Sequence, residues 1–140
     1  MILCHLNYLA VAVCTIIYFA IGAMWFSMLF GKPWMEGHNI TMPTDAEKKA
    51  AMQKEMPKYM FMSLLFSLIG VLALAYMETA MYTHDWMTGC KAGLVASTFV
   101  IVMVAQSHMY LRKSFKLFLI DAGYHVVSLI ITGIILSVWR

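Results

Sequence analysis

Long apolar runs alternate with short polar segments along the whole chain. A membrane-spanning helix needs about 20 consecutive, mainly apolar residues, and four stretches meet this requirement. We predict spans at residues 6–30, 58–81, 87–111 and 117–139. The pattern therefore predicts an all-α polytopic membrane protein, in which four transmembrane helices form a single domain, an antiparallel bundle.

The longest polar segment, residues 31–57, separates the first two spans. It opens with Lys32-Pro33-Trp34, a cation, a helix breaker and an interfacial aromatic residue, which we interpret as a helix stop. Thr44-Asp45-Ala46-Glu47 has the form of a capping box, and Pro57 follows a few turns later. Lysines and apolar residues alternate between them, so we expect a short cytoplasmic helix on the membrane surface that Pro57 ends.

The composition is too apolar for a soluble protein. Hydrophobic residues make up 62% of the 140 residues and charged residues 12%, whereas globular domains average about 45–50% and about 25%. A soluble domain of this length has too little interior to bury so much apolar surface. The composition excludes a soluble enzyme domain, a disordered chain and a nucleic-acid binder, and it makes the lipid bilayer the expected surrounding.

Basic residues are distributed unevenly between the two ends of the predicted bundle. One end holds Lys32, Lys48, Lys49, Lys54, Lys58, Arg112, Lys113 and Lys116. The other end holds only Lys91 and Arg140. Because Lys and Arg in short loops favour the cytoplasmic side, we expect the first end in the cytoplasm and both termini outside.

Small residues recur at every fourth position on the last two predicted spans. Gly89, Gly93 and Ser97 form one such stripe, and Gly133 and Ser137 form another. Stripes of this kind let helix backbones approach closely in lipid. We expect packing within the bundle, and the alternative is a seam between copies of the chain in a dimer or trimer.

Ionisable residues inside spans are the main candidates for chemistry. Asp121 and His125 lie one helical turn apart, and Gln106 and His108 return to a similar depth on the neighbouring span. We predict a cluster of these four side chains in the cytoplasmic half of the bundle. Three interpretations stay open: a hydrogen-bonded staple between helices, which we favour, a proton or cation relay, and a metal site of Asp121, His108 and His125.

A second polar set lies at the outer end of the predicted bundle. Its members are His5, Asn7, Glu78, His84 and Asp85, with Cys4 and Cys90 nearby. Met81, His84, Met87 and Cys90 follow one another at intervals of three, and such ligands suit soft metals such as Cu(I). The chain has 14 methionines, however, and methionine is a general gap filler. We therefore favour loop solvation over a metal site, and expect no cofactor.

No catalytic motif is present in the sequence. It lacks a Gly-rich phosphate loop, an H-E-x-x-H pair and a nucleophile elbow. The leading hypothesis is therefore an assembly or accessory membrane subunit without enzyme activity, which self-associates or binds another membrane protein. The alternative is a small transporter or an ion or proton pathway, lined by Asp121, His125, His108 and Gln106.

Two stretches resemble a known family. One runs from Asn7-Tyr8-Leu9-Ala10-Val11 through Gly22-Ala23-Met24-Trp25-Phe26-Ser27 to Phe30-Gly31-Lys32-Pro33-Trp34-Met35, and the other is residues 116–125, with Gly133 and Trp139-Arg140 after it. Together they resemble the domain of unknown function 1761, small membrane proteins found mainly in bacteria. The resemblance implies four helices and a bacterial inner membrane, and it supplies no reaction. Members usually carry Asn where this chain has Asp121, which favours the staple.

Overall fold

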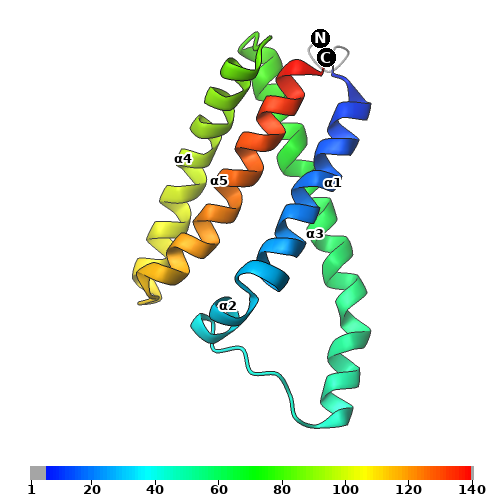
Figure 1. The fold of residues 1–140 in the computed structure, drawn as a ribbon, viewed down its shortest axis with the longest axis vertical. Coiled ribbons are helices and arrows are strands. Elements are labelled where there is room, and N and C mark those ends of the chain that lie inside the picture. Colours follow the sequence, from blue (N-terminus) through cyan, green and yellow to red (C-terminus); the bar gives the residue numbers. More distant parts are fainter. Residues whose placement is uncertain (1–5, 140) are drawn as a thin grey trace.

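The computed structural model describes residues 6–139, and these residues form helices and connections without any strand. The elements are α1 (Tyr8–Met24), the π-helical segment η2 (Trp25–Leu29), α2 (Gly31–Gly37), α3 (Ala46–Ala80), α4 (Trp86–Tyr110) and α5 (Phe115–Val138) (Figure 1). Four helices are long and apolar enough to cross a membrane: Tyr8–Leu29, α3, α4 and α5. The predicted all-α fold with four spans is confirmed, and the protein is an integral membrane protein.

The spans form a bundle in which α5 contacts each of the other three. Figure 1 shows α4 and α5 side by side and antiparallel, with α1 on the other flank of α5 and α3 behind. The start of α1 and the end of α5 lie together, at what we call the terminal end. At the opposite end, which we call the basic end, lie α2, the first turns of α3 and the turn from α4 to α5.

The basic residues follow this division. All eight of the predicted cytoplasmic set belong to α2, the first turns of α3, the α4–α5 turn or the first turn of α5, whereas Lys91 stands in the second turn of α4, at the terminal end. Arg140 lies outside the described residues, as do Cys4 and His5. The charge separation therefore exists in space as well as in the sequence.

Close packing between α4 and α5 depends on the small residues. A Cβ atom on Gly93 would lie 2.5 Å from the carbonyl oxygen of Leu129, and one on Gly133 would lie 2.7 Å from the carbonyl oxygen of Gly89. Ser97 and Ser137 are buried along the same contact. Both stripes therefore face each other within one chain, where the helix backbones come together as small residues permit.

The surface helix predicted to end at Pro57 is not a separate element. Asp45 caps α3, accepting a hydrogen bond from the backbone N–H of Glu47, and the helix then continues through Pro57 for 35 residues. Proline removes one backbone hydrogen bond. At this position α3 is exposed, so water can satisfy the freed carbonyl, and the Ala, Met, Lys and Glu residues around it are strong helix formers.

The predicted helix stop at residues 32–34 is also different in the structure. The chain passes through the π-helical segment η2, turns at Phe30 and Gly31, and forms the short helix α2. A Cβ atom on Gly31 would lie 2.8 Å from the carbonyl oxygen of Phe26, so only glycine fits this turn without displacement. The turn brings α2 back against the beginning of α5.

Candidate functional site

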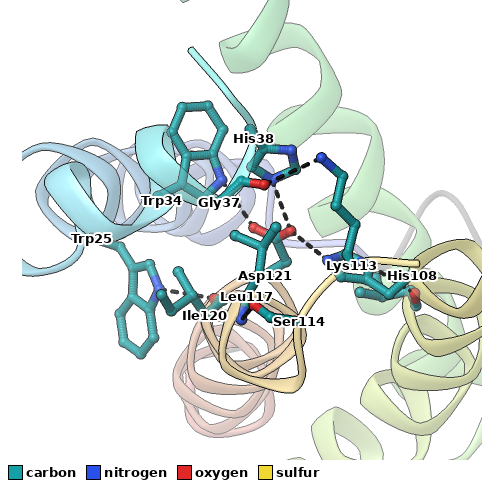
Figure 2. Close-up of polar contacts among 11 residues, drawn as sticks. Trp25, Trp34, Gly37, His38, His108, Lys113, Ser114, Leu117, Ile120 and Asp121 are labelled. Carbon is teal, nitrogen blue, oxygen red and sulfur yellow. Dashed lines mark hydrogen bonds and ion pairs between the residues drawn. The ribbon is translucent and has the colours of Figure 1, made fainter. Parts of the chain in front are cut away.

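Three nitrogen-bearing side chains surround the carboxylate of Asp121, which stands in the second turn of α5 (Figure 2). The indole Nε1 of Trp34 donates a hydrogen bond to Oδ1 at 2.9 Å. His38 Nε2 lies 3.1 Å from Oδ2, and His108 Nε2 lies 3.0 Å from the same oxygen. The Asp121 side chain is only 16% exposed. We call these four residues the Asp121 cluster.

The cluster joins three elements that are far apart in the sequence. Trp34 lies on α2, and His38, the C-cap residue, follows it by one turn, so the two lie on the same side of that helix. His108 comes from the last turns of α4. Two contacts hold this region in place: in η2, Trp25 Nε1 donates to the carbonyl oxygen of Ile120 at 3.0 Å, and Lys113 Nζ donates to that of Gly37 in α2 at 3.2 Å. The position of α2 thus depends on polar contacts as well as on packing.

The hydrogen bond of His108 determines which ring nitrogen faces Asp121. Its Nδ1 lies 2.9 Å from the carbonyl oxygen of Val104. Because a carbonyl only accepts, Nδ1 carries a hydrogen, and a neutral ring would present a bare Nε2 to Asp121. Two acceptors 3.0 Å apart repel each other. A hydrogen between His108 Nε2 and Asp121 Oδ2 would relieve this repulsion.

The close approach of His108 to Asp121 is not a well-aligned hydrogen bond. His108 Nε2 is buried and close enough to Oδ2 for an ion pair, yet it is not directed for a hydrogen bond to it. His38 contacts the same oxygen and is itself 29% exposed. The cluster thus combines this close contact with a second imidazole that is partly exposed at the basic end.

Two of the predicted cluster residues lie elsewhere. His125 Nδ1 is 3.0 Å from the hydroxyl oxygen of Tyr18 on α1, so its ring is hydrogen-bonded across the bundle and not to Asp121. Gln106 is exposed. It stands two residues before His108 on α4, which turns it to the opposite face of the helix, away from the cluster. Of the predicted four, the structure brings together only Asp121 and His108.

A buried polar face of α5 leads from the cluster into the bundle. Asp121, His125, Ser128 and Thr132 are spaced by four, three and four residues, which places them along one side of the helix. Ser128 and Thr132 are completely buried. The Thr132 hydroxyl donates to the carbonyl oxygen of Ser128 at 2.7 Å, whereas the Ser128 hydroxyl has no hydrogen-bond partner among residues 6–139. Buried hydroxyls normally have a partner.

The sequence matches one protein family over nearly its whole length. Residues 9–137, nearly the entire chain, match the family described as Protein of unknown function (DUF1761). The chain belongs to the DUF1761 family. The family description names no activity, and no curated protein and no solved structure matches the chain. Any function must therefore come from the chemistry of the residues themselves.

The residues of the two metal hypotheses lie in different parts of the bundle. Within the described chain, no three His, Cys, Asp or Glu side chains are arranged to hold a metal ion. In the Asp121 cluster, His38 and His108 approach one oxygen from different sides (Figure 2). At the terminal end, Met81, His84 and Met87 are exposed and Cys90 is half-buried. Asp85 instead caps α4.

Sequence reasoning missed Trp34 and His38. The motif Lys32-Pro33-Trp34 predicts the end of a helix, because proline breaks helices. Proline is also common in the first turn of a new helix, where a backbone N–H would have no intrahelical acceptor. Pro33 occupies that first turn of α2, and the spacing from Trp34 to His38 is one helical turn. That spacing was the available signal.

Proposed function

We propose that this membrane protein is a proton pathway, which takes up a proton at the Asp121 cluster and passes it along the buried face of α5. The single observation that carries the proposal is the 3.0 Å approach of His108 Nε2 to Asp121 Oδ2 without an aligned hydrogen bond, while Nδ1 donates to the carbonyl oxygen of Val104. An imidazole changes its charge near neutral pH and can both take up and release protons. The partly exposed His38 offers a route from solution to the pair.

The geometry favours this function over the accessory subunit that the sequence favoured. A purely structural staple needs each donor to meet one acceptor, as Trp34 meets Asp121. The Asp121–His108 contact departs from this, because a neutral His108 would turn a lone pair toward the carboxylate. The polar face beyond it, with the unpartnered hydroxyl of Ser128, adds groups that can donate and accept along the same helix.

The variant Asp121→Asn distinguishes a proton relay from a purely structural hydrogen-bonded contact between the helices. The amide oxygen can still accept from Trp34, and the amide N–H can donate to the bare Nε2 of His108, so the helices stay joined. The amide cannot release a proton by titrating. We expect the variant to keep its thermal stability and to lose proton flux.

The measurement uses purified protein in liposomes that contain a pH-sensitive dye, with a potassium diffusion potential as the driving force. Flux through wild-type protein should exceed that of protein-free liposomes, and flux through Asp121→Asn should fall to that level. Gln106→Ala, an exposed side chain at a similar depth, is the matched control and should conduct normally. Undiminished flux in Asp121→Asn, or none in the wild type, would contradict the proposal.

A second candidate, the accessory or self-associating subunit, is favoured by the first half of α3. All residues from Ala46 to Phe66 are exposed, including Phe61 and Phe66, although α3 is apolar from Tyr59 onward. Figure 1 shows these turns standing apart from the other spans. Native mass spectrometry after gentle extraction tests this candidate. A stoichiometric foreign subunit would support it, and a bare monomer would oppose it.

We further propose that the basic end faces the cytoplasm of a bacterial inner membrane, with both termini outside. The eight basic residues at that end support this orientation. Single cysteines in an otherwise cysteine-free chain test it. A membrane-impermeant reagent should label Lys91→Cys on intact cells and should leave Arg112→Cys unlabelled. The reverse pattern would show the opposite orientation.

A further inference from the structure

Glu78 is a fully buried carboxyl group close to the terminal end of the bundle. It stands in the last turn of α3, where the sequence placed it among solvated polar residues, yet it is only 1% exposed. The beginning of α1 and the end of α5 cover it there. A carboxyl group so far from water is costly unless it carries a proton or meets favourable partners, so it marks a site.

Gly133, which packs against Gly89 and Gly93 of α4, makes room for this carboxyl group between the helices. A Cβ atom on Gly133 would lie 3.1 Å from Glu78 Oε1, 2.7 Å from the carbonyl oxygen of Gly89 and 3.4 Å from the backbone nitrogen of Gly93. A larger residue at position 133 would therefore push against Glu78 and α4 together. The glycine at position 133 thus leaves space on α5 for the side chain of Glu78, which comes from α3.

A small cavity connects Glu78 with the terminal end. Its volume is about 20 Å³, and its lining includes Asn7 and Ala10 of α1, Glu78 and Thr79 of α3, and Leu136 and Trp139 near the end of α5. A space of this size holds about one water molecule, since a water needs about 10–15 Å³ on the same measure. The Asn7 amide, which also donates to the Trp139 carbonyl oxygen at 3.5 Å, is a polar neighbour for it.

Glu78 also lies where the polar face of α5 ends. That face runs from Asp121 through His125 and Ser128 to Thr132, and the next residue, Gly133, packs on Glu78. One buried polar face therefore has an ionisable group at each end, the Asp121 cluster near the basic end and Glu78 near the terminal end.

We infer that Glu78 is the second proton-binding carboxyl group of the pathway, and this inference rests on the proposed function. A proton leaves the Asp121–His108 pair and reaches Glu78 through hydroxyl groups and water. It converts the carboxylate to the carboxylic acid and is then released to water in the cavity. No bond other than bonds to hydrogen forms or breaks, and no electron is transferred.

Groups of α1, of the α3–α4 connection and of α5 face Glu78. From α1 the thiol of Cys14 interacts with its charge, and from the α3–α4 connection the hydroxyl of Thr83 lies 3.5 Å from Oε2. From α5 Gly133, which does not titrate, packs against Oε1. Cys14 is a titratable side chain that faces Glu78 from a neighbouring helix.

Infrared spectroscopy of the protein in bilayers tests the inference without relying on flux. The chain has four glutamates, and Glu36, Glu47 and Glu55 are exposed. With carbon-13 in the glutamate carboxyl groups, the wild-type protein should show a carboxyl band from a buried glutamate that responds to pH. Glu78→Gln should lose that band, and Glu36→Gln should keep it. A buried band that is absent, or that does not change with pH, would overturn the inference.

Flux measurements then separate the two claims. Glu78→Gln should lose proton flux in liposomes, whereas Glu36→Gln should conduct like the wild type. Undiminished flux in Glu78→Gln would overturn the role of Glu78 while leaving the Asp121 cluster intact. If wild-type protein shows no flux, the proposed pathway fails, and the infrared titration still decides whether Glu78 binds a proton.

Discussion

Gly93→Ala tests how closely α4 and α5 depend on each other. The added Cβ atom would lie 2.5 Å from the carbonyl oxygen of Leu129 and 2.8 Å from the Cα atom of Ile130. Both are backbone atoms of α5, so neither can rotate away as a side-chain end could. Ordinary contact begins at 3.4 Å, and the helices would therefore have to separate locally by roughly 0.9 Å in a close-packed interior.

The expected cost follows from that displacement. Overpacking a close contact typically costs about 1–3 kcal/mol of unfolding free energy. Replacing glycine by alanine inside a helix also returns about 1 kcal/mol of helix propensity, which would hide part of the loss. Gly70→Ala on α3 is the matched control, because a Cβ atom there would meet nothing within 4 Å. The difference between the two variants cancels propensity and should equal about 1–3 kcal/mol.

The assay is equilibrium unfolding in mixed micelles, followed by tryptophan fluorescence. Gly70→Ala should be at least as stable as the wild type, and Gly93→Ala should be clearly less stable than Gly70→Ala. Equal stability of the two variants would refute the close contact between α4 and α5. A change of oligomer size in Gly93→Ala with no change in its unfolding would instead indicate a seam between copies of the chain.

Two further predictions concern the N-terminal cap of α4 and the position of α2. Hydrogen bonding from the backbone N–H of Thr88 lowers the pKa of Asp85, an exposed residue that caps α4. The ionised carboxylate therefore stabilises the folded protein above the ordinary Asp pKa, and this contribution disappears as the pH falls through the lowered value. Thermal unfolding at neutral and acidic pH should show that Asp85→Asn loses less stability on acidification than the wild type; an equal loss would refute this account of the cap. Trp34→Phe keeps an aromatic ring against Phe26 but removes the indole donor to the cluster. Hydrogen exchange should then become faster in α2 and stay unchanged in the middle of α4, and unchanged exchange in α2 would mean that the indole does not hold that helix.

The sequence was sufficient for the features that long helices determine. Each span is one continuous apolar run, so its existence did not depend on tertiary contacts. The depth of Asp121 and His108 also followed from helix geometry, because both stand a few turns from the same tight connection. Residues at equal depth on neighbouring helices can meet, and these two do.

The direction of each side chain required the three-dimensional structure. His125 shares a face with Asp121, but α1 comes closer to it and offers the hydroxyl of Tyr18. Gln106 lies at the same depth as the cluster, but its side chain is on the exposed face of α4. Glu78 stands at the end of a span, where residues are usually solvated, and is buried because α1 and α5 cover that end. The residues next to Glu78 in the sequence give no indication that α1 and α5 bury it.

The most direct test of the account is the protonation of His108 in lipid bilayers. Nitrogen-15 NMR of histidine-labelled protein can report both ring nitrogens, with His108→Gln identifying the signals among the five histidines. The structure predicts that Nδ1 carries a hydrogen in the folded protein, since it donates to the carbonyl oxygen of Val104, and that Nε2 is the nitrogen that faces Asp121. A neutral ring with a bare Nδ1 and a permanent hydrogen on Nε2 would make the contact an ordinary staple and contradict the proton pathway.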